Sequence, residues 1–502
     1  MIPGIIPGAF GFILLPVFTY YLDPVDYGIV AVLGMVIGLM LVLSETGSGW
    51  VISSNYYRLN ENDRKELLFN QAFLEACLKI FWGVVFWVFA QNILPLLITE
   101  YSPKLLYYFT FLLIAFFLQI IKSTVLSTII IQKKGFLFAF IGLSSWLLGL
   151  FVSLYSLIIL KLGVLALFVG RLVSALVTFM LQILYFRKNV KPKLRKKWLK
   201  EIINIGFPAM PKAVSSFTLN VCDKFLIQRW LSLFALGIYS HSLVYRQFPV
   251  MLNNSFNRSF TPEFMEKYTK SQQTSPFKPI SECWIALFLV MTMFFICYSE
   301  ELINILTHGK FVAAAPLVPL WFLGALVVSY GGFYSRLILY FKKTKFFLYI
   351  GVIAGLANLG LNVALIQKFG MMGAVVATII SILFTALSYI FYAKKLSGAH
   401  FADNKFTFSI GLILIAYILN LFLNPSLLVS TLVFAASCIF TIYYFNLIHL
   451  IKLILSEGIP GLNTLGEIDN MPVEWQGVGR EKADHGLKGI SNFLRALKNE
   501  LF

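Results

Sequence analysis

The chain has 502 residues, of which 59% are hydrophobic and only 13% are charged, and its mean hydropathy is +0.80. This composition excludes an ordinary water-soluble globular protein and predicts a membrane protein. Apolar runs of about 18 residues or more recur along the chain, each long enough to cross a bilayer as a helix, and the short alternating segments of a membrane barrel are absent.

In chain order, the apolar runs predict an all-α polytopic membrane protein with about fourteen transmembrane helices. The first run has no basic segment before it and no small-residue cleavage site, so we expect a retained helix and not a signal peptide. The predicted helices cover residues 2–22, 27–53, 71–95, 105–131, 136–160, 164–186, 202–228, 234–257, 281–306, 313–340, 346–366, 371–393, 406–424 and 427–451.

Basic residues are distributed unevenly between alternate connections. Those on one side contain 23 Lys and Arg residues and those on the other contain five. Since cytoplasmic loops carry the excess, we expect both termini in the cytoplasm. The formal net charge of +18 then reflects topology, and the run "RKNVKPKLRKKWLK" at 187–200 is an orientation signal that also contacts anionic membrane lipid, not a nucleic-acid site.

Two segment pairs indicate an internal duplication. Residues 160–189 and 367–396 share nine identities in 30 positions, which align Gly163 with Gly370 at an offset of 207. A similar offset of 209 relates "LDPVDYGIVAV" to "LSLFALGIYSH" and aligns Gly28 with Gly237.

The offset predicts two parallel-repeat six-helix bundles, related by an axis along the membrane normal. The first bundle covers 1–200 and the second covers 201–400, followed by two additional transmembrane helices at 401–455. Residues 456–502 are expected to form a cytoplasmic tail with an amphipathic helix. Transporters of this design bind substrate between the halves and rock one half against the other.

Seven basic residues lie inside the predicted helices, and we set three intramembrane acids against them. An isolated charge at mid-bilayer costs about 2.5–3.5 kcal/mol and so requires a partner or a wet cavity. These residues are Lys79, Lys122, Arg171, Lys212, Lys224, Arg246 and Arg336, with Glu45, Glu75 and Asp223. The excess of cations predicts an anionic ligand, since Lys and Arg together suit phosphate groups.

Three of these charges have a simple structural interpretation. Glu75 and Lys79 stand four residues apart and are expected to form an ion pair within one helix. Arg336 lies near the end of its helix and is expected to extend to the membrane surface. For Arg171, extension to the surface and a place in a cavity are both open.

Lys122, Lys212 and Arg246 lie deeper, and we expect them to bind substrate together with Lys224 and Arg171. Lys212, Ser216, Asn220 and Asp223 follow at steps of 4, 4 and 3, so they share one helix face. A cavity is the favoured interpretation of this polar stripe, with a structural pair formed by Asp223 as the alternative. Glu45, beside "TGSG", is either a proton or sodium site or a helix-to-helix hydrogen bond.

Motifs of enzymes are absent. The chain has no P-loop, no GxSxG, no HExxH and no cysteine or histidine spacing for a metal. We therefore expect no enzyme activity and no cofactor, with transport driven by a partner, by the substrate gradient, or by coupling to H⁺ or Na⁺.

Three segments resemble bacterial polysaccharide-unit flippases of the Wzx type, which serve O-antigen and capsule synthesis and belong to the multidrug, oligosaccharidyl-lipid and polysaccharide flippase superfamily. They are "FILLPVFTYYLDPVDYGIVAVL", "IGFPAMPKAVSSFTLNVCDKFLIQRWLSLFALGIYS" and "NLGLNVALIQKFGMMGAVVATIIS". The resemblance implies transfer of undecaprenyl-pyrophosphate-linked oligosaccharides to the periplasmic leaflet through a cationic cavity. Where such proteins often have Asp-Arg in the seventh helix, this chain has Asp223-Lys224.

As partners we expect the lipid-linked oligosaccharide, membrane lipid, and the polysaccharide polymerase and chain-length machinery, with no nucleic acid. The main alternative is a cation-coupled multidrug or small-molecule exporter of the same superfamily, which should prefer an acidic cavity. A membrane scaffold or a glycosyltransferase subunit is a third class, disfavoured by the internal repeat and by the lack of a carboxylate-rich soluble loop.

Overall fold

The computed structural model describes residues 10–98, 102–207, 210–343, 345–423 and 425–449. All regular elements in these ranges are helices, which confirms the predicted all-α membrane fold. The chain divides into two compact units. Unit 1 contains Tyr21–Gly237, and unit 2 contains Gly11–Tyr20 with the chain from Ile238 onward, so the chain passes between the units within α2 (Leu15–Tyr21) and α13 (Leu233–Ser271).

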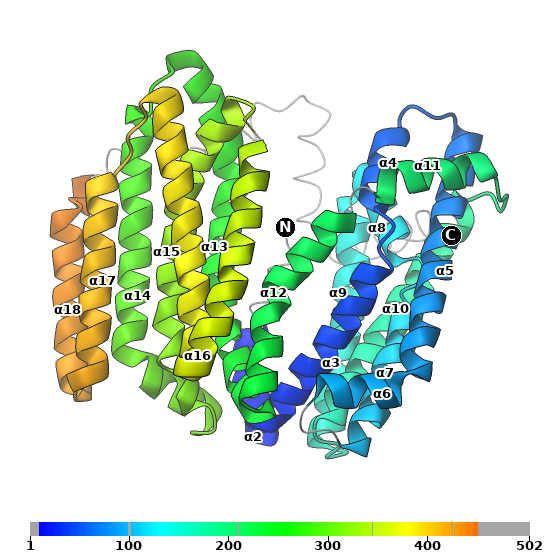
Figure 1. Ribbon diagram of the computed structural model, residues 1–502, viewed down its shortest axis with the longest axis horizontal. Helices are drawn as coiled ribbons and strands as arrows, with labels where there is room; N and C mark the ends of the chain where they lie inside the picture. The colour runs from blue at the N-terminus through cyan, green and yellow to red at the C-terminus, as the bar shows by residue number, and fades with distance from the viewer. Residues whose placement is uncertain (1–9, 99–101, 208–209, 344, 424, 450–502) are drawn as a thin grey trace, which may run out of the picture. The chain divides into compact units, whose positions relative to one another are not determined.

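Unit 1 is a bundle in which α3 packs on α5, α7 and α12, and α10 packs on α7 and α9 (Figure 1). Two of its helices begin at side-chain caps: Asp23 and Asp26 form a capping box at α3, and Asn60 accepts a hydrogen bond from the Asp63 backbone at α5. The elements are α3 (Pro24–Leu43), α4 (Ser48–Asn55), α5 (Glu61–Val88), α6 (Ala90–Leu97), α7 (Pro103–Phe117), α8 (Lys122–Ile131), α9 (Gly135–Ile158), α10 (Leu165–Asn189), α11 (Lys196–Gly206) and α12 (Met210–Trp230).

Unit 2 is centred on α15, whose side chains are buried along almost its whole length between α14 and α16. Long aromatic and aliphatic residues cover it on every face, as expected of a helix that is apolar all round. Besides most of α13, the elements are α14 (Lys278–Thr307), α15 (Leu317–Tyr340), α16 (Lys345–Ser397), α17 (Asp403–Leu423) and α18 (Leu427–Tyr444), with two short 3₁₀ turns at Ser275–Phe277 and Val312–Ala314.

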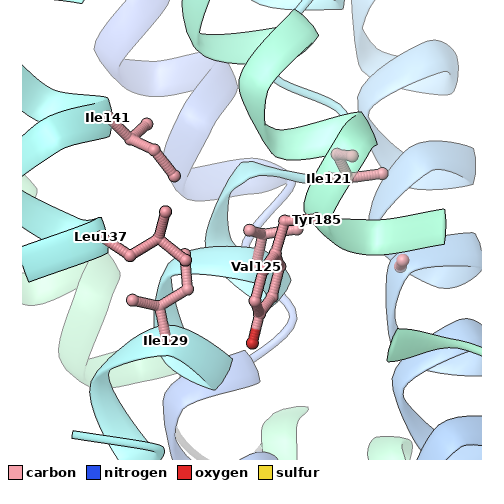
Figure 2. Close-up of a cluster of buried hydrophobic side chains, with 7 residues drawn as sticks. Ile121, Val125, Ile129, Leu137, Ile141 and Tyr185 are labelled. Carbon is pink, nitrogen blue, oxygen red and sulfur yellow. The ribbon is translucent and has the colours of Figure 1, made fainter. Parts of the chain in front are cut away.

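One hydrophobic cluster in unit 1 joins α8, α9 and α10. Figure 2 shows the side chains of Ile129, Leu137 and Ile141 pointing toward Val125 and the ring of Tyr185. These residues are 1% exposed or less. Full burial of each such side chain contributes about 1.5–3 kcal/mol relative to water, so the cluster fixes α8 against its two neighbours.

The structure corrects several predicted helix boundaries. The predicted helix 27–53 is interrupted between α3 and α4, and the predicted helix 105–131 is bent by 43° between α7 and α8. The predicted helix 202–228 is two elements, α11 and α12. The predicted helix 234–257 continues to Ser271, and the predicted pair 346–366 and 371–393 runs through α16 with a break at Gly370.

Among the described residues, nine helices are long and apolar enough to cross a membrane, or ten if the bent pair α7 and α8 counts as one span. This supports a multi-pass membrane protein. The short α2 and the more polar α12 and α13 are not among them, and α16 covers two predicted spans. The count of fourteen stays a prediction, and so do the boundaries of the two six-helix bundles and of the C-terminal pair. The tail 456–502 lies outside the described residues.

The aligned glycines Gly163 and Gly370 both have a positive φ angle. Their φ angles are +57° and +59°, in the left-handed region that favours glycine. Gly163 lies just before α10, and Gly370 separates the two straight parts of α16. The two positions that the sequence comparison aligned therefore share a positive φ at a break between apolar helical segments.

Candidate functional site

A cavity of about 350 Å³ lies within unit 1, between α3, α10 and the bend of α7 and α8. Most of its wall is apolar or glycine. The polar side chains that line it are Gln119, Lys122, Arg171, Ser174 and Thr178. The wall has two cations and no carboxylate.

The interruption between α7 and α8 places Lys122 in this wall. α7 ends at Phe117 and α8 begins at Lys122, so Gln119 lies in the bend itself. Lys122 Nζ donates a hydrogen bond to Gln119 Oε1 at 2.9 Å, while Gln119 Nε2 donates to the Ala115 carbonyl at 3.1 Å. Since Lys122 is only half-buried and its Nζ donates to a neutral amide, its positive charge stays available to a ligand.

Arg171 enters the same cavity from the early part of α10. Its side chain is exposed, and within the described ranges it forms no ion pair or hydrogen bond to the protein. Ser174 and Thr178 follow at steps of 3 and 4 and therefore share its helix face. Close packing fixes this helix: a Cβ on Gly170 would lie 1.8 Å from Ser153 Oγ of α9.

The chemistry of this cavity favours an anionic group. A lysine ammonium acts as a point charge and an arginine guanidinium as a planar fork, and both bind phosphate oxygens. The apolar wall lowers the local dielectric constant, which strengthens attraction between these cations and a bound anion. Hydroxyl groups of Ser174 and Thr178 can add hydrogen bonds to oxygens.

The structure therefore brings two of the five predicted substrate-binding residues together, Lys122 and Arg171. Lys224 is half-buried on α12 and does not line this cavity. Lys212 lies on α12, but its side chain is outside the described residues, as are those of Ser216 and Asn220. The predicted polar stripe thus stays a prediction.

Asp223 is 8% exposed, and its Oδ1 accepts a hydrogen bond from the Lys224 backbone at 2.8 Å. The two roles predicted for Asp223, an ion-coupling site and a structural pair, both stay predictions.

Arg246 belongs to unit 2, where an aromatic ring partners its charge. The guanidinium carbon lies 4.9 Å from the ring centroid of Trp321, within the range of a cation–π interaction. Trp321 is buried and its Nε1 donates to Ser242 Oγ at 3.0 Å, which fixes the ring. The substrate-binding role predicted for Arg246 stays a prediction.

Glu45 is not inside a continuous helix, contrary to the prediction. α3 ends at Leu43 and α4 begins at Ser48, and Glu45 Oε1 accepts a hydrogen bond from the Gly47 backbone at 3.0 Å. Gly47 has a φ of +63°, and a Cβ there would lie 2.5 Å from the Gly206 Cα. The turn forms because glycine permits both the left-handed backbone and this close approach to α11.

Arg336 does not extend to the membrane surface, so that prediction is wrong. Its side chain is 4% exposed on α15, where Nε donates to Thr261 Oγ1 at 3.2 Å and Nη2 donates to Asn257 Oδ1. Three phenylalanine rings surround the guanidinium at 4.7–5.6 Å: Phe256, Phe260 and Phe333. α13 continues past the predicted end and covers it.

Sequence reasoning missed the neutral part of the cavity wall. Gln119 precedes Lys122 by one helical turn, and Ser174 and Thr178 follow Arg171 on one face. The spacing of three and four residues that predicted a polar stripe on α12 is therefore also present on α10. Reasoning from sequence also missed a second cavity of about 290 Å³ in unit 2, whose wall includes Glu300, Glu301 and Asn420.

The protein is thus an all-helical multi-pass membrane protein of two units, with a cavity in unit 1 that is lined by two cationic side chains. The structure is similar to that of the lipid II flippase MurJ in its inward closed conformation, with a TM-score of 0.71 and 14% identity over 89% of this chain and 99% of that chain. Residues 17–316 match the family of polysaccharide biosynthesis proteins, and the chain belongs to that family. The resemblance to polysaccharide and lipid-linked flippases that the sequence indicated is thereby confirmed.

Two drug transporters share the fold as well. An inward-facing multidrug resistance transporter of the MATE family gives a TM-score of 0.59 with 13% identity over 77% of this chain and 94% of that chain. A Vibrio cholerae MATE transporter gives 0.51 with 11% identity over 79% and 99%. No curated protein sequence matches the chain.

Proposed function

We propose that the protein moves undecaprenyl-pyrophosphate-linked oligosaccharide units from the cytoplasmic to the periplasmic leaflet of the bacterial inner membrane during surface polysaccharide synthesis. The cavity that contains Lys122 and Arg171 is the observation that carries this proposal. Membership in the polysaccharide biosynthesis family agrees with it. The two cations would bind the pyrophosphate, while the polyprenyl tail stays in lipid.

Movement would follow alternating access, with the two predicted halves rocking about the substrate. Both termini would lie in the cytoplasm. Coupling to H⁺ or Na⁺ is part of this proposal. Of the two acidic residues predicted for it, we retain Asp223, because the Glu45 carboxylate accepts a backbone hydrogen bond in the turn between α3 and α4. The polymerase and chain-length machinery would receive the transferred units.

Binding of undecaprenyl pyrophosphate to the purified protein in detergent tests the role of the cavity. We expect Lys122→Gln and Arg171→Gln each to weaken binding about tenfold, which corresponds to about 1.4 kcal/mol, because each removes one charge from the phosphate site. Lys368→Gln is the matched control, since Lys368 is an exposed lysine of unit 2 outside both cavities. Equal affinity in all three variants would contradict the proposal.

Deletion of the gene tests the direction of transport. Lipid-linked oligosaccharide units should accumulate on the cytoplasmic face of the membrane, and the wild-type chain should reverse this. If the units still reach the periplasm at the normal rate, the flippase function is wrong.

A cation-coupled multidrug exporter is the second candidate, and one observation favours it. Glu300 and Glu301 line the cavity of unit 2, and within the described residues neither carboxylate has an ion-pair partner. Acidic cavities suit cationic drugs. Binding of a cationic dye that Glu301→Gln abolishes, with no binding of undecaprenyl pyrophosphate, would favour the exporter.

A further inference from the structure

The bend between α7 and α8 creates two half-helix ends inside unit 1. An α-helix carries partial positive charge at its N-terminus and partial negative charge at its C-terminus, because the terminal N–H and C=O groups lack helical partners. In a membrane these groups need partners from the protein. A negative charge beside the N-terminus of α8 and a positive charge beside the C-terminus of α7 would therefore stabilise the bend.

Glu75 of α5 supplies the negative charge. Its Oε1 accepts a hydrogen bond from the Ser123 backbone at 3.1 Å, and its Oε2 accepts from the Thr124 backbone at 3.0 Å and from Thr124 Oγ1 at 2.7 Å. The residue is fully buried. Glu75 thus caps the N-terminus of α8 from a different helix.

Lys79 supplies the positive charge one turn further along α5. Its Nζ donates to Glu75 Oε1 at 2.6 Å and also to the carbonyl oxygen of Gln119, in the bend two residues after α7 ends. Lys79 is 5% exposed. The carboxylate therefore faces the N-terminus of α8, and the ammonium faces a backbone carbonyl of the bend that follows the C-terminus of α7, so each charge lies on the side that the half-helix dipoles favour.

The residues held by this pair are those that line the cavity. Gln119 belongs to the bend and Lys122 begins α8, and their side chains are hydrogen-bonded to each other at 2.9 Å. Glu75 and Lys79 do not line the cavity themselves. A change at the pair would reach a ligand only by moving the bend.

We propose that Glu75 and Lys79 are positioning residues that hold the bend of α7 and α8 in the geometry that presents Lys122 to the anionic group of the substrate. This inference rests on the proposed function for the identity of the ligand. The proposed role differs from that of a simple ion pair within one helix, because the geometry of the bend depends on which of the two positions carries the negative charge and which carries the positive charge.

Exchange of the two charges separates these interpretations. Glu75→Lys with Lys79→Glu keeps an i,i+4 ion pair on α5 but places the wrong sign at each half-helix end. The chain offers a matched control on the same helix, Glu61→Lys with Lys65→Glu, since that pair has the same spacing and the same 2.6 Å distance but is exposed. In both exchanged pairs the lysine precedes the glutamate along the helix, which is the less favourable order for an i,i+4 pair. This effect is therefore the same for the inner and the outer pair.

Two measurements follow the effect of these charge exchanges on the bend and on ligand binding. The bend is followed by the distance between spin labels on Ile114→Cys of α7 and Ile130→Cys of α8, both exposed positions, after the five native cysteines are replaced. Ligand affinity is followed with undecaprenyl pyrophosphate in detergent. We expect exchange of the inner pair to shift the label distance and weaken binding about tenfold, and exchange of the outer pair to change neither.

The outcomes are distinct. Loss of affinity with an unchanged label distance would overturn the positioning role, and so would a shifted distance with unchanged affinity. If the label distance shifts but the wild-type protein binds no undecaprenyl pyrophosphate, the proposed function fails while the role of the pair in holding the bend stands.

A second variant keeps the test valid if the exchanged protein does not fold. Glu75→Gln retains one acceptor oxygen but leaves either Ser123 N–H or Thr124 N–H facing an amide donor. We expect a smaller change of label distance and affinity in the same direction. Glu61→Gln is its control, and equal behaviour of the two variants would overturn the proposal.

Discussion

Gly28 and Gly237 form a reciprocal close contact between the first turns of α3 and α13. A Cβ on Gly28 would lie 2.1 Å from the Leu233 carbonyl oxygen, and a Cβ on Gly237 would lie 1.7 Å from the Pro24 carbonyl oxygen. Leu233 precedes Gly237 by four residues, as Pro24 precedes Gly28. Each helix therefore offers the same two positions to the other, which is the reciprocity expected of elements related by a two-fold axis.

Replacement of either glycine by alanine should destabilise the protein. The added methyl group would overlap backbone atoms that cannot move independently, and overpacking of this kind costs about 1–3 kcal/mol. Gly34→Ala is the control, because Gly34 lies on the same helix with nothing within 4 Å of an added Cβ. Thermal unfolding in detergent should show a lower Tm for Gly28→Ala and Gly237→Ala only, and a normal Tm for either would contradict the contact.

Arg336 should resist replacement by lysine. Lysine keeps the charge but loses the planar fork that reaches Thr261 and Asn257 while stacking among phenylalanine rings. Hydrogen bonds of a charged donor contribute about 1.5–3 kcal/mol each, so Arg336→Lys should lower Tm nearly as much as Arg336→Met. Arg258→Lys on α13 gives the control, and full stability of Arg336→Lys would show that the charge alone suffices.

The sequence predicted the membrane helices because apolar runs of sufficient length have few alternatives in a bilayer. It also aligned Gly28 with Gly237 and Gly163 with Gly370, and the structure gives each pair matching roles. Glycine at these positions meets a steric requirement. The two repeats therefore share these glycines even where the apolar residues around them differ.

The helix breaks could not be predicted from composition. The segment after Phe117 is more polar than α7 but contains no proline or glycine up to Ile131 that would indicate a bend, and the groups that stabilise the bend come from α5, 48 and 49 residues earlier in the chain. Glu75 and Lys79 were predicted to form an ion pair, which the structure contains, but their spacing gives no sign of the half-helices they contact.

The error at Arg336 has a related cause. Distance from a predicted helix end suggested that its side chain could reach water. The end of α13 was placed at residue 257, whereas the helix continues to Ser271 and brings Phe256 and Phe260 over the guanidinium. Burial of Arg336 is thus a tertiary effect that its own segment does not encode.

Asp403 should be required for docking of α17 in unit 2. Its Oδ1 accepts hydrogen bonds from Tyr330 and Tyr334 of α15, and its Oδ2 lies 2.7 Å from Lys394 Nζ of α16. Asp403→Ala removes these contacts together and should cost about 2–3 kcal/mol, whereas Asp403→Asn keeps an acceptor for the tyrosines and should cost less.

Limited proteolysis near residues 398–402 and thermal unfolding both measure this docking. The control is Glu266→Gln, because the Glu266–Lys270 pair is exposed and such pairs contribute little. Equal protease resistance of Asp403→Ala and wild type would contradict the docking role.

Glu45 should act as a cap for the turn between α3 and α4 and not as an ion-coupling residue. Its carboxylate accepts the Gly47 N–H at 3.0 Å, and a glutamine at this position retains the acceptor oxygen while it removes the titratable charge. We therefore expect Glu45→Gln to transport at nearly the wild-type rate and to keep any dependence on a proton or sodium gradient. Glu45→Ala should lower stability by about 1 kcal/mol because the N–H loses its acceptor. Transport by reconstituted vesicles with and without an imposed gradient measures the first effect, and loss of gradient dependence in Glu45→Gln would assign the coupling site to this carboxylate instead.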